Sequence, residues 1–256
     1  MHHARIDRLS YQDSFVHRLD SRVKLVAAIV FSVFVIWLPA TSVSILACYA
    51  VGPFAVLVVG KVPIRFALKQ ILLVSPFVLV LALSSLFYDK TPAEVAFGPL
   101  SWTVRSGLVR CFAICGKFVI TMSVLIGLVA TTRFSDLLAG MAKLGVPRLL
   151  VVQLGFLWRY IFLLIDRAYD ILRARVGRKL RNLGFKTELK TAGAMVGTLC
   201  LGGLDTAGRI NMAMQGRGFT GRLHTLSVMR LKTADWVFIA VFGLYLAGLC
   251  FLEGVF

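Results

Sequence analysis

Residues 25–60 read LVAAIVFSVFVIWLPATSVSILACYAVGPFAVLVVG and contain no charged side chain. A single straight helix of this length would measure about 54 Å, whereas the hydrocarbon core of a bilayer is about 30 Å thick. The run from Pro39 to Ser42, near the middle of the stretch, is typical of a turn. The stretch therefore predicts two membrane spans, at about 22–38 and 43–60, with a kink at Gly52-Pro53 in the second.

Three more stretches have the length and apolarity of membrane spans, at about 70–88, 106–130 and 236–252. Two further apolar stretches are ambiguous, because 146–165 holds two arginines and 191–204 is too short to span comfortably. We expect both to be helices against the inner face of the membrane. The predicted fold class is all-α, a polytopic membrane protein with about five transmembrane helices, and six to seven is the alternative.

The composition excludes several classes of protein. Hydrophobic residues make up 58% of the 256 positions and charged residues 16%, with a mean hydropathy of +0.82. Soluble domains contain roughly 45–50% apolar and about 25% charged residues. The 29 Lys and Arg residues nevertheless outnumber the 12 Asp and Glu residues, which leaves a net charge of +17. A disordered tail, a disulfide scaffold and an ordinary cytosolic enzyme are all excluded.

The basic residues predict the orientation of the chain, because positive charge marks the cytoplasmic side of a membrane protein. Of the 29 basic residues, 25 lie in 1–24, 61–69 and 131–235, which face one side if the spans alternate. We expect a multi-pass protein of the cytoplasmic (inner) membrane with a cytoplasmic N-terminus. The predicted domains are a basic lead-in with four spans at 1–130, a cytoplasmic helical region at 131–235, and a final span at 236–256.

The cytoplasmic region contains three predicted helices. A short helix is expected at 134–143, and Pro147 then favours the start of a long helix that runs to about Leu183. A second long helix is expected from about Thr187 to Gln215, where the small residues of 216–218 end it.

Each long helix carries an arginine with small or aliphatic neighbours close to its end. The two motifs are Ala174-Arg175-Val176 and Gly216-Arg217-Gly218. A guanidinium in such a setting can reach into the groove of a partner and bind a carboxylate through two hydrogen bonds. The other interpretation is that both arginines supply ordinary inside-facing charge that orients the chain.

A second candidate contact surface consists of Gly193, Gly197, Gly202 and Lys117. Small residues favour the close approach of a partner helix. Lys117 lies deep in a predicted span, where charges rarely face lipid. It points at a partner subunit, pairs with Asp89 or Glu94, or extends to the outer interface.

No motif predicts catalysis or a bound metal. His, Cys, Asp and Glu residues lack zinc-ligand spacing, and the acids are too scattered for an acid–base pair. The stretch 216–221 has neither the Lys-Ser/Thr pair nor the preceding strand of a phosphate-binding loop. We therefore expect no metal site, no cofactor bound by this chain, and no enzymatic activity of its own.

The sequence leaves two other functions open. A self-contained secondary permease would need ionisable groups near the bilayer midplane, where only Arg110 and Lys117 qualify. A membrane-anchored nucleic-acid binder could use the arginines at 173–181, but the cytoplasmic bias of positive charge already explains them, and no nucleic-acid partner is expected. Copurification discriminates among these functions.

The lead-in 14–25, Ser-Phe-Val-His-Arg-Leu-Asp-Ser-Arg-Val-Lys-Leu, resembles the segment before the first span in the transmembrane T component of energy-coupling-factor (ECF) transporters. The similarity is to the cobalt/nickel branch, the CbiQ family, and begins at Ser10. The stretch 213–219, Ala-Met-Gln-Gly-Arg-Gly-Phe, resembles the second Ala-Arg-Gly coupling motif of that family, with Gly216 in place of Ala. Residues 174–176 correspond to the first, with Val176 in place of the usual Gly or Ser.

This resemblance implies a scaffold that couples ATP hydrolysis to the uptake of cobalt or nickel ions. The expected partners are two ABC-type ATPase subunits, which bind ATP and magnesium and receive the coupling arginines. The others are a membrane-embedded, CbiM-like S component that binds the substrate, a small accessory membrane subunit, and the lipid bilayer. The region 131–235 would then be the coupling region.

Overall fold

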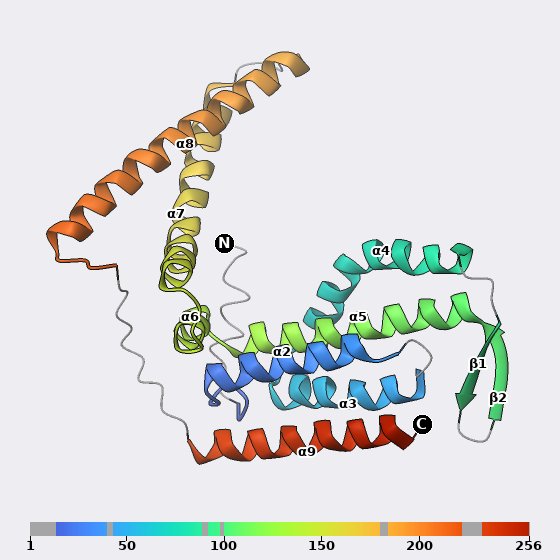
Figure 1. Cartoon of the computed structure of the whole chain (residues 1–256). Helices are drawn as coiled ribbons and strands as arrows, with labels where there is room; N and C mark the ends of the chain where they lie inside the picture. Colours follow the sequence, from blue (N-terminus) through green and yellow to red (C-terminus); the bar gives the residue numbers. More distant parts are fainter. Residues whose placement is uncertain are drawn as a thin grey trace. The chain divides into compact units, whose positions relative to one another are not determined.

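The computed structural model describes residues 14–39, 43–88, 92–97, 100–179, 184–221 and 232–255. Ser10–Asp13 of the lead-in and most of the predicted turn at 39–42 lie outside these ranges. The elements in chain order are α2 (Ser21–Trp37), α3 (Val43–Val59), α4 (Ile64–Tyr88), β1 (Pro92–Phe97), β2 (Leu100–Arg105), α5 (Ser106–Thr131), α6 (Phe134–Lys143), α7 (Arg148–Arg178), α8 (Phe185–Gly216) and α9 (Thr233–Val255) (Figure 1).

The predicted helical membrane fold with about five spans is confirmed. Helices α2, α3, α4, α5 and α9 coincide with the five predicted spans. Four stretches of the described residues are long and apolar enough to cross a membrane, namely Ile64–Leu86, Gly107–Thr131, Arg148–Arg178 and Thr233–Leu252, and Ile45–Val59 is a shorter apolar helix. The third stretch is α7, whose first half we expected to lie against the inner face.

One local feature was not predicted. The segment that joins α4 to α5 forms an antiparallel hairpin, in which β1 pairs with β2 from Pro92 opposite Arg105 to Phe97 opposite Leu100. The alternation of polar and apolar residues in 100–105 was a signal for a strand. The hairpin is a small addition to a helical fold.

The chain divides into two compact units, which are described separately. One unit comprises Met1–Gly140 with Ser227–Phe256, and the other comprises Met141–Leu226. The predicted domain boundaries after 130 and 235 separate membrane-embedded from cytoplasmic segments. The division into compact units does not test them, because it contains no information about a membrane.

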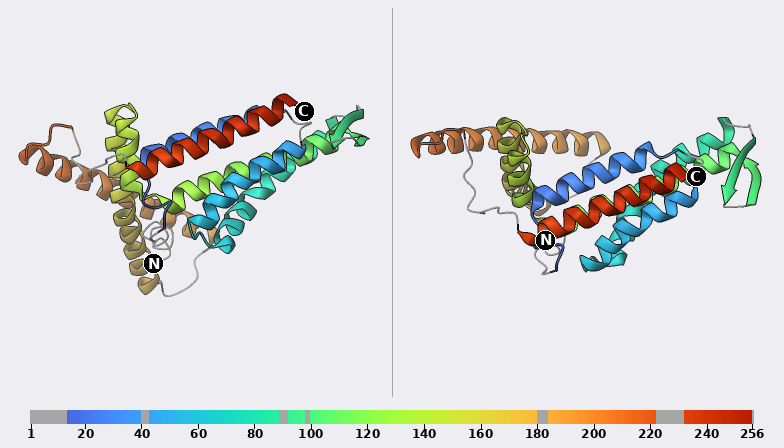
Figure 2. Two further views of the ribbon diagram at one scale, coloured as in Figure 1. Left: turned by 90° about the horizontal axis from the view of Figure 1, so that it is seen from below. Right: turned by 60° about the horizontal axis from the view of Figure 1, so that its bottom comes forward.

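Helix α5 is the centre of the first unit. It packs against α2, α3 and α4, and α9 packs against α2 and α3 (Figure 2). Buried side chains form an apolar core, made of Phe31, Val35, Leu38, Ile45, Leu46, Tyr49, Ile120 and Leu249. Many large apolar side chains of α4, among them Leu72, Leu73 and Phe77, are exposed on the isolated chain. A lipid environment accommodates such side chains without cost.

Helix α3 contacts α9 at the position where we expected a kink. Pro53 lies inside α3 and has no N–H to donate to the preceding turn. One position earlier, Gly52 N–H donates to the Tyr245 hydroxyl at 3.1 Å, and that hydroxyl donates to the Cys48 carbonyl at 2.8 Å. The hydroxyl therefore bridges a backbone pair that would bond directly in a regular helix.

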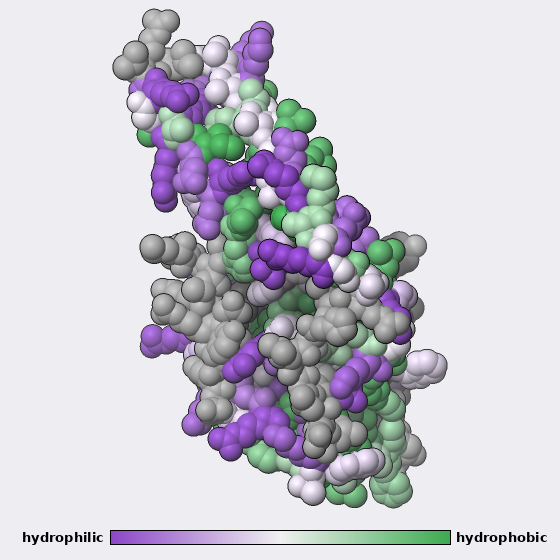
Figure 3. Space-filling model, turned by 90° about the vertical axis from the view of Figure 1, so that its left-hand side faces the viewer, coloured by the Kyte–Doolittle hydropathy of each residue, from purple (hydrophilic) through white to green (hydrophobic). Residues whose placement is uncertain are grey.

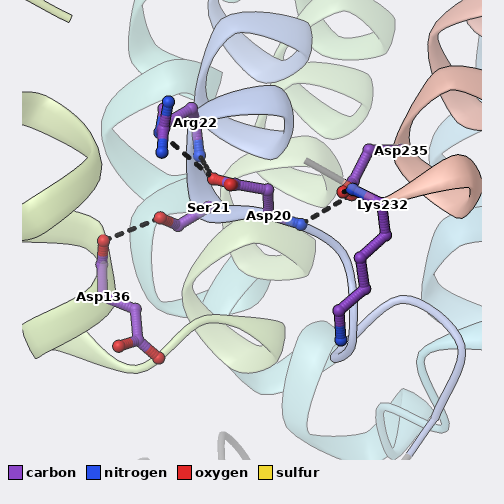
Figure 4. Close-up of polar contacts among 6 residues, drawn as sticks. All are labelled: Asp20, Ser21, Arg22, Asp136, Lys232 and Asp235. Atoms are coloured by element: carbon purple, nitrogen blue, oxygen red, sulfur yellow. Dashed lines mark hydrogen bonds and ion pairs between the residues drawn. The ribbon is translucent and has the colours of Figure 1, made fainter. Parts of the chain in front are cut away.

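The polar lead-in ties together the ends of several helices (Figure 4). Asp20 caps α2 by accepting from the Arg22 N–H at 3.0 Å, which satisfies a free N-terminal donor. The Asp20 N–H donates to Asp235, the buried acid at the start of α9, at 2.8 Å. The Ser21 hydroxyl donates to the Asp136 carbonyl of α6 at 2.7 Å.

Lysines join α2 to α5 at both ends of α2. The ammonium of Lys24, a buried residue in the first turn of α2, donates to the Thr131 carbonyl at the end of α5 at 3.0 Å. In return, Lys117 of α5 donates to the Ile36 carbonyl at 3.1 Å and to the Leu38 carbonyl at the end of α2. Cations favour the C-terminal ends of helices, where carbonyls lack partners within the helix, so the two helices cap each other.

Candidate functional site

Helices α7 and α8 carry the two arginine motifs. Pro147 stands at the N-cap of α7, where its missing N–H costs nothing. Neither helix contains a fully buried residue. Along this pair, hydrophilic and hydrophobic side chains alternate on the surface, as the upper part of Figure 3 shows.

Helices α7 and α8 pack against each other in an antiparallel arrangement. Near the middle, Arg167 of α7 donates to the Gly202 carbonyl at 3.0 Å and to the Thr206 hydroxyl at 2.8 Å. At one end Arg175 contacts Glu188, and at the other the Phe156 and Phe219 rings lie 6.3 Å apart. The arginine motifs therefore lie at opposite ends of the pair, and do not meet.

Arg217 stands at the C-cap of α8, in a Schellman motif. The Phe219 N–H donates to the Met214 carbonyl at 3.0 Å, and the Gly218 N–H donates to the Gln215 carbonyl at 2.9 Å. Gly218 has a φ of +77°, a conformation that glycine adopts without steric cost. This geometry explains the glycine after the arginine. The Arg217 side chain is exposed and has no polar partner among the described residues.

Arg175 is in a different setting. Its motif lies inside α7, which continues to Arg178, so position 176 needs no glycine and a valine fits. The Arg175 guanidinium forms an ion pair with Glu188 of α8, and Lys179 binds the other carboxylate oxygen at 2.8 Å. The hydrogen bond from Lys179, together with Arg175, lowers the pKa of Glu188, which is therefore ionised at neutral pH.

The candidate glycines divide into two groups. A Cβ at Gly193 or Gly197 would meet open space, whereas a Cβ at Gly202 would lie 3.5 Å from the Arg167 guanidinium. The reason is geometric, because positions 193 and 202 are nine residues apart and lie about 180° apart around a helix. Gly193 and Gly197 therefore share a free face, and Gly202 belongs to the contact with α7.

Lys117 belongs to the other unit. Its bonds to the two carbonyls of α2 account for a charge within a span without requiring a partner chain. Asp89 lies outside the described residues, and the Glu94 side chain is not described.

Glu188 is the residue of this site that we did not predict. It is the one acid in 171–204, and seven basic residues lie between 173 and 190. A single acid in so basic a segment was a signal for an ion pair, although not for which base. In the described part of the chain, no group of three His, Cys, Asp or Glu residues could hold a metal ion.

Comparisons with known proteins identify transport proteins that are similar to this chain. Residues 12–226 match the family model CbiQ, described as a cobalt transport protein. The chain is 28% identical to the energy-coupling factor transporter transmembrane protein EcfT of Leuconostoc gelidum, over 86% of this chain and 85% of that protein. It is 27% identical to EcfT of Bacillus selenitireducens, over 92% and 91%.

A third relative is the cobalt transport protein CbiQ of Salmonella typhimurium, which is 26% identical over 68% of this chain and 78% of that protein. The family model covers most of the chain, including the lead-in, the central spans and both arginine motifs. The chain therefore belongs to the CbiQ family of cobalt transport proteins.

Proposed function

We propose that this chain is the transmembrane T component of an energy-coupling-factor importer for cobalt, with nickel as the alternative substrate. The family and the relatives named EcfT and CbiQ support a transmembrane transport component. The single observation that carries the coupling role is the Schellman motif that presents the Arg217 side chain at the end of α8.

In this proposal the chain is not catalytic. Two ABC-type ATPase subunits bind and hydrolyse ATP with magnesium, and their acidic grooves receive the arginines of α7 and α8. A membrane-embedded S component, CbiM-like and accompanied by a small accessory subunit, binds the ion. Helices of 31 and 32 residues are rigid enough to carry the motion of the ATPases to the S component.

Reversal of the charge at Arg217 tests docking. Arg217→Glu is expected to release the ATPase subunits in a detergent pull-down, because it places a carboxylate opposite an acidic groove. Arg209→Glu is the matched control, since this exposed arginine lies two turns earlier on α8. Retention of the complete complex by Arg217→Glu would contradict the proposal. Purification of the chain with no partner at all would favour a self-contained secondary permease.

The free face of α8 provides a second test. Gly197→Leu is expected to uncouple uptake from ATP hydrolysis, because a bulky side chain there blocks the close approach of a partner helix. Gly177→Leu is the control, since a side chain at this position of α7 also meets open space. Uptake and ATPase activity are measured in proteoliposomes, and normal uptake by Gly197→Leu would contradict a contact at this face.

A further inference from the structure

The two motif arginines differ in what they bind within the chain. Arg217 is exposed and has no polar partner among the described residues, whereas the side chain of Arg175 is only 22% exposed. The guanidinium of Arg175 contacts Glu188 through Nη2, and its Nη1 lies 3.9 Å from the Met195 sulfur. A guanidinium prefers a planar carboxylate partner, and for Arg175 that position is occupied by α8 itself.

The carboxylate of Glu188 is shared between two cations of α7. Lys179 binds Oε1 at 2.8 Å while Arg175 binds Oε2. The contrast on the same helix is Arg173, whose side chain is 79% exposed and whose nitrogen lies 3.8 Å from Asp170. An ion pair this open to water is weak, so Arg173 can exchange partners readily. The more buried Arg175 stays bound to Glu188.

We propose that Glu188 is an internal substitute for the acidic partner of Arg175, which an ATPase subunit must displace when it docks. This inference rests on the proposed function. The two arginines are then not equivalent. Arg217 engages a groove directly, and Arg175 follows by exchanging one carboxylate for another, so the chain alone presents one docking arginine and the complex uses two.

The first test uses the chain alone in detergent, with phenylglyoxal as the probe of arginine accessibility and mass spectrometry to read each site. In the wild-type chain we expect Arg175 to react several-fold more slowly than Arg173 and Arg217. Glu188→Gln should bring the rate of Arg175 to that of Arg173. Asp170→Asn removes the same charge from α7 and should leave Arg175 slow. Equal rates for Arg175 and Arg217 in the wild-type chain would overturn the proposal.

The second test adds the ATPase pair that copurifies with the chain. Glu188→Gln is expected to bind the pair about two- to fivefold more tightly, on the scale of a surface ion pair that no longer competes. Asp170→Asn should bind as the wild type does. Weaker binding by Glu188→Gln would show that Glu188 supports docking, and would overturn the proposal.

Phenylglyoxal reactivity, measured with and without the ATPase pair, also distinguishes failure of this inference from failure of the docking function. Protection of Arg217 from phenylglyoxal when the ATPase pair is added supports docking, whatever the behaviour of Arg175. If Arg217 stays reactive in the mixture while Arg175 is slow in the chain alone, docking fails and the internal ion pair stands. If Arg217 is protected and Arg175 was never slow, docking stands and this inference fails.

Discussion

In the first unit of the molecule, a single side-chain hydroxyl links two helices. The Tyr245 hydroxyl accepts from the Gly52 N–H and donates to the Cys48 carbonyl, just before Pro53 in α3. The ring also packs tightly, since a Cβ at Gly52 would lie 2.9 Å from it. This one hydroxyl therefore supplies a partner for a backbone donor and a backbone acceptor of α3, in apolar surroundings where a backbone group without a partner is costly.

Tyr245→Phe is therefore expected to lower the free energy of unfolding by about 1–2 kcal/mol, because it removes two hydrogen bonds between α9 and α3. Tyr169→Phe is the control, since the Tyr169 side chain is exposed on α7. Thermal unfolding of the two variants in detergent measures the difference. Equal unfolding temperatures would show that water or a lipid headgroup replaces the hydroxyl.

At the scale of the element, the two motif arginines differ in where they lie along their helices. Helix α8 ends in a Schellman motif because Gly218 adopts a positive φ, and Arg217 stands at the C-cap as a result. Helix α7 passes through its arginine motif without a break. The two motifs look alike in the sequence, yet one terminates a helix and the other is part of one.

Two alanine substitutions separate these features. Gly218→Ala is expected to destabilise the end of α8 by about 1–2 kcal/mol, because an L-residue is strained at positive φ. Gly216→Ala, at the last helical position and in open space, should be neutral or stabilising by a few tenths of a kcal/mol. Hydrogen exchange of the residues around Met214 reports both effects, and equal protection in the two variants would refute the role of Gly218.

The distribution of charge concerns the whole molecule. The basic residues concentrate in three segments, which predicts that the N-terminus and the α7–α8 region are cytoplasmic. Helix α7 is also long and apolar enough to cross a membrane. Its 31 residues would span about 46 Å, and the charged residues from Asp166 onward favour the cytoplasm over hydrocarbon.

Reporter fusions distinguish these arrangements. We expect green fluorescent protein fused after Lys143 and after Lys179 to be fluorescent, and alkaline phosphatase fused after Phe256 to be active. Opposite results for the two fusions that flank α7 would show that this helix crosses the membrane. A fluorescent fusion after Phe256 would place the C-terminus inside and change the number of spans to an even one.

Much of the fold could be predicted because its signals are local. The charge-free stretches mark α2, α3 and α9, Pro147 marks the start of α7, and the glycines of 216–218 mark the end of α8. Each depends on residues within one or two turns of one another, where helix geometry is independent of the rest of the chain. Arg217 could be predicted as a candidate for the same reason, since its motif consists of neighbouring residues at a helix end.

The sequence by itself therefore determined a helical membrane protein, its approximate spans and the exposed arginine at the end of α8. Only the tertiary structure decided that Glu188 pairs with Arg175, that Gly202 faces α7 while Gly193 and Gly197 are free, and that Tyr245 bridges Gly52 and Cys48. The physical reason is that each of these contacts joins two different helices. Which faces meet depends on the direction and rotation of both, and no local pattern of residues specifies that.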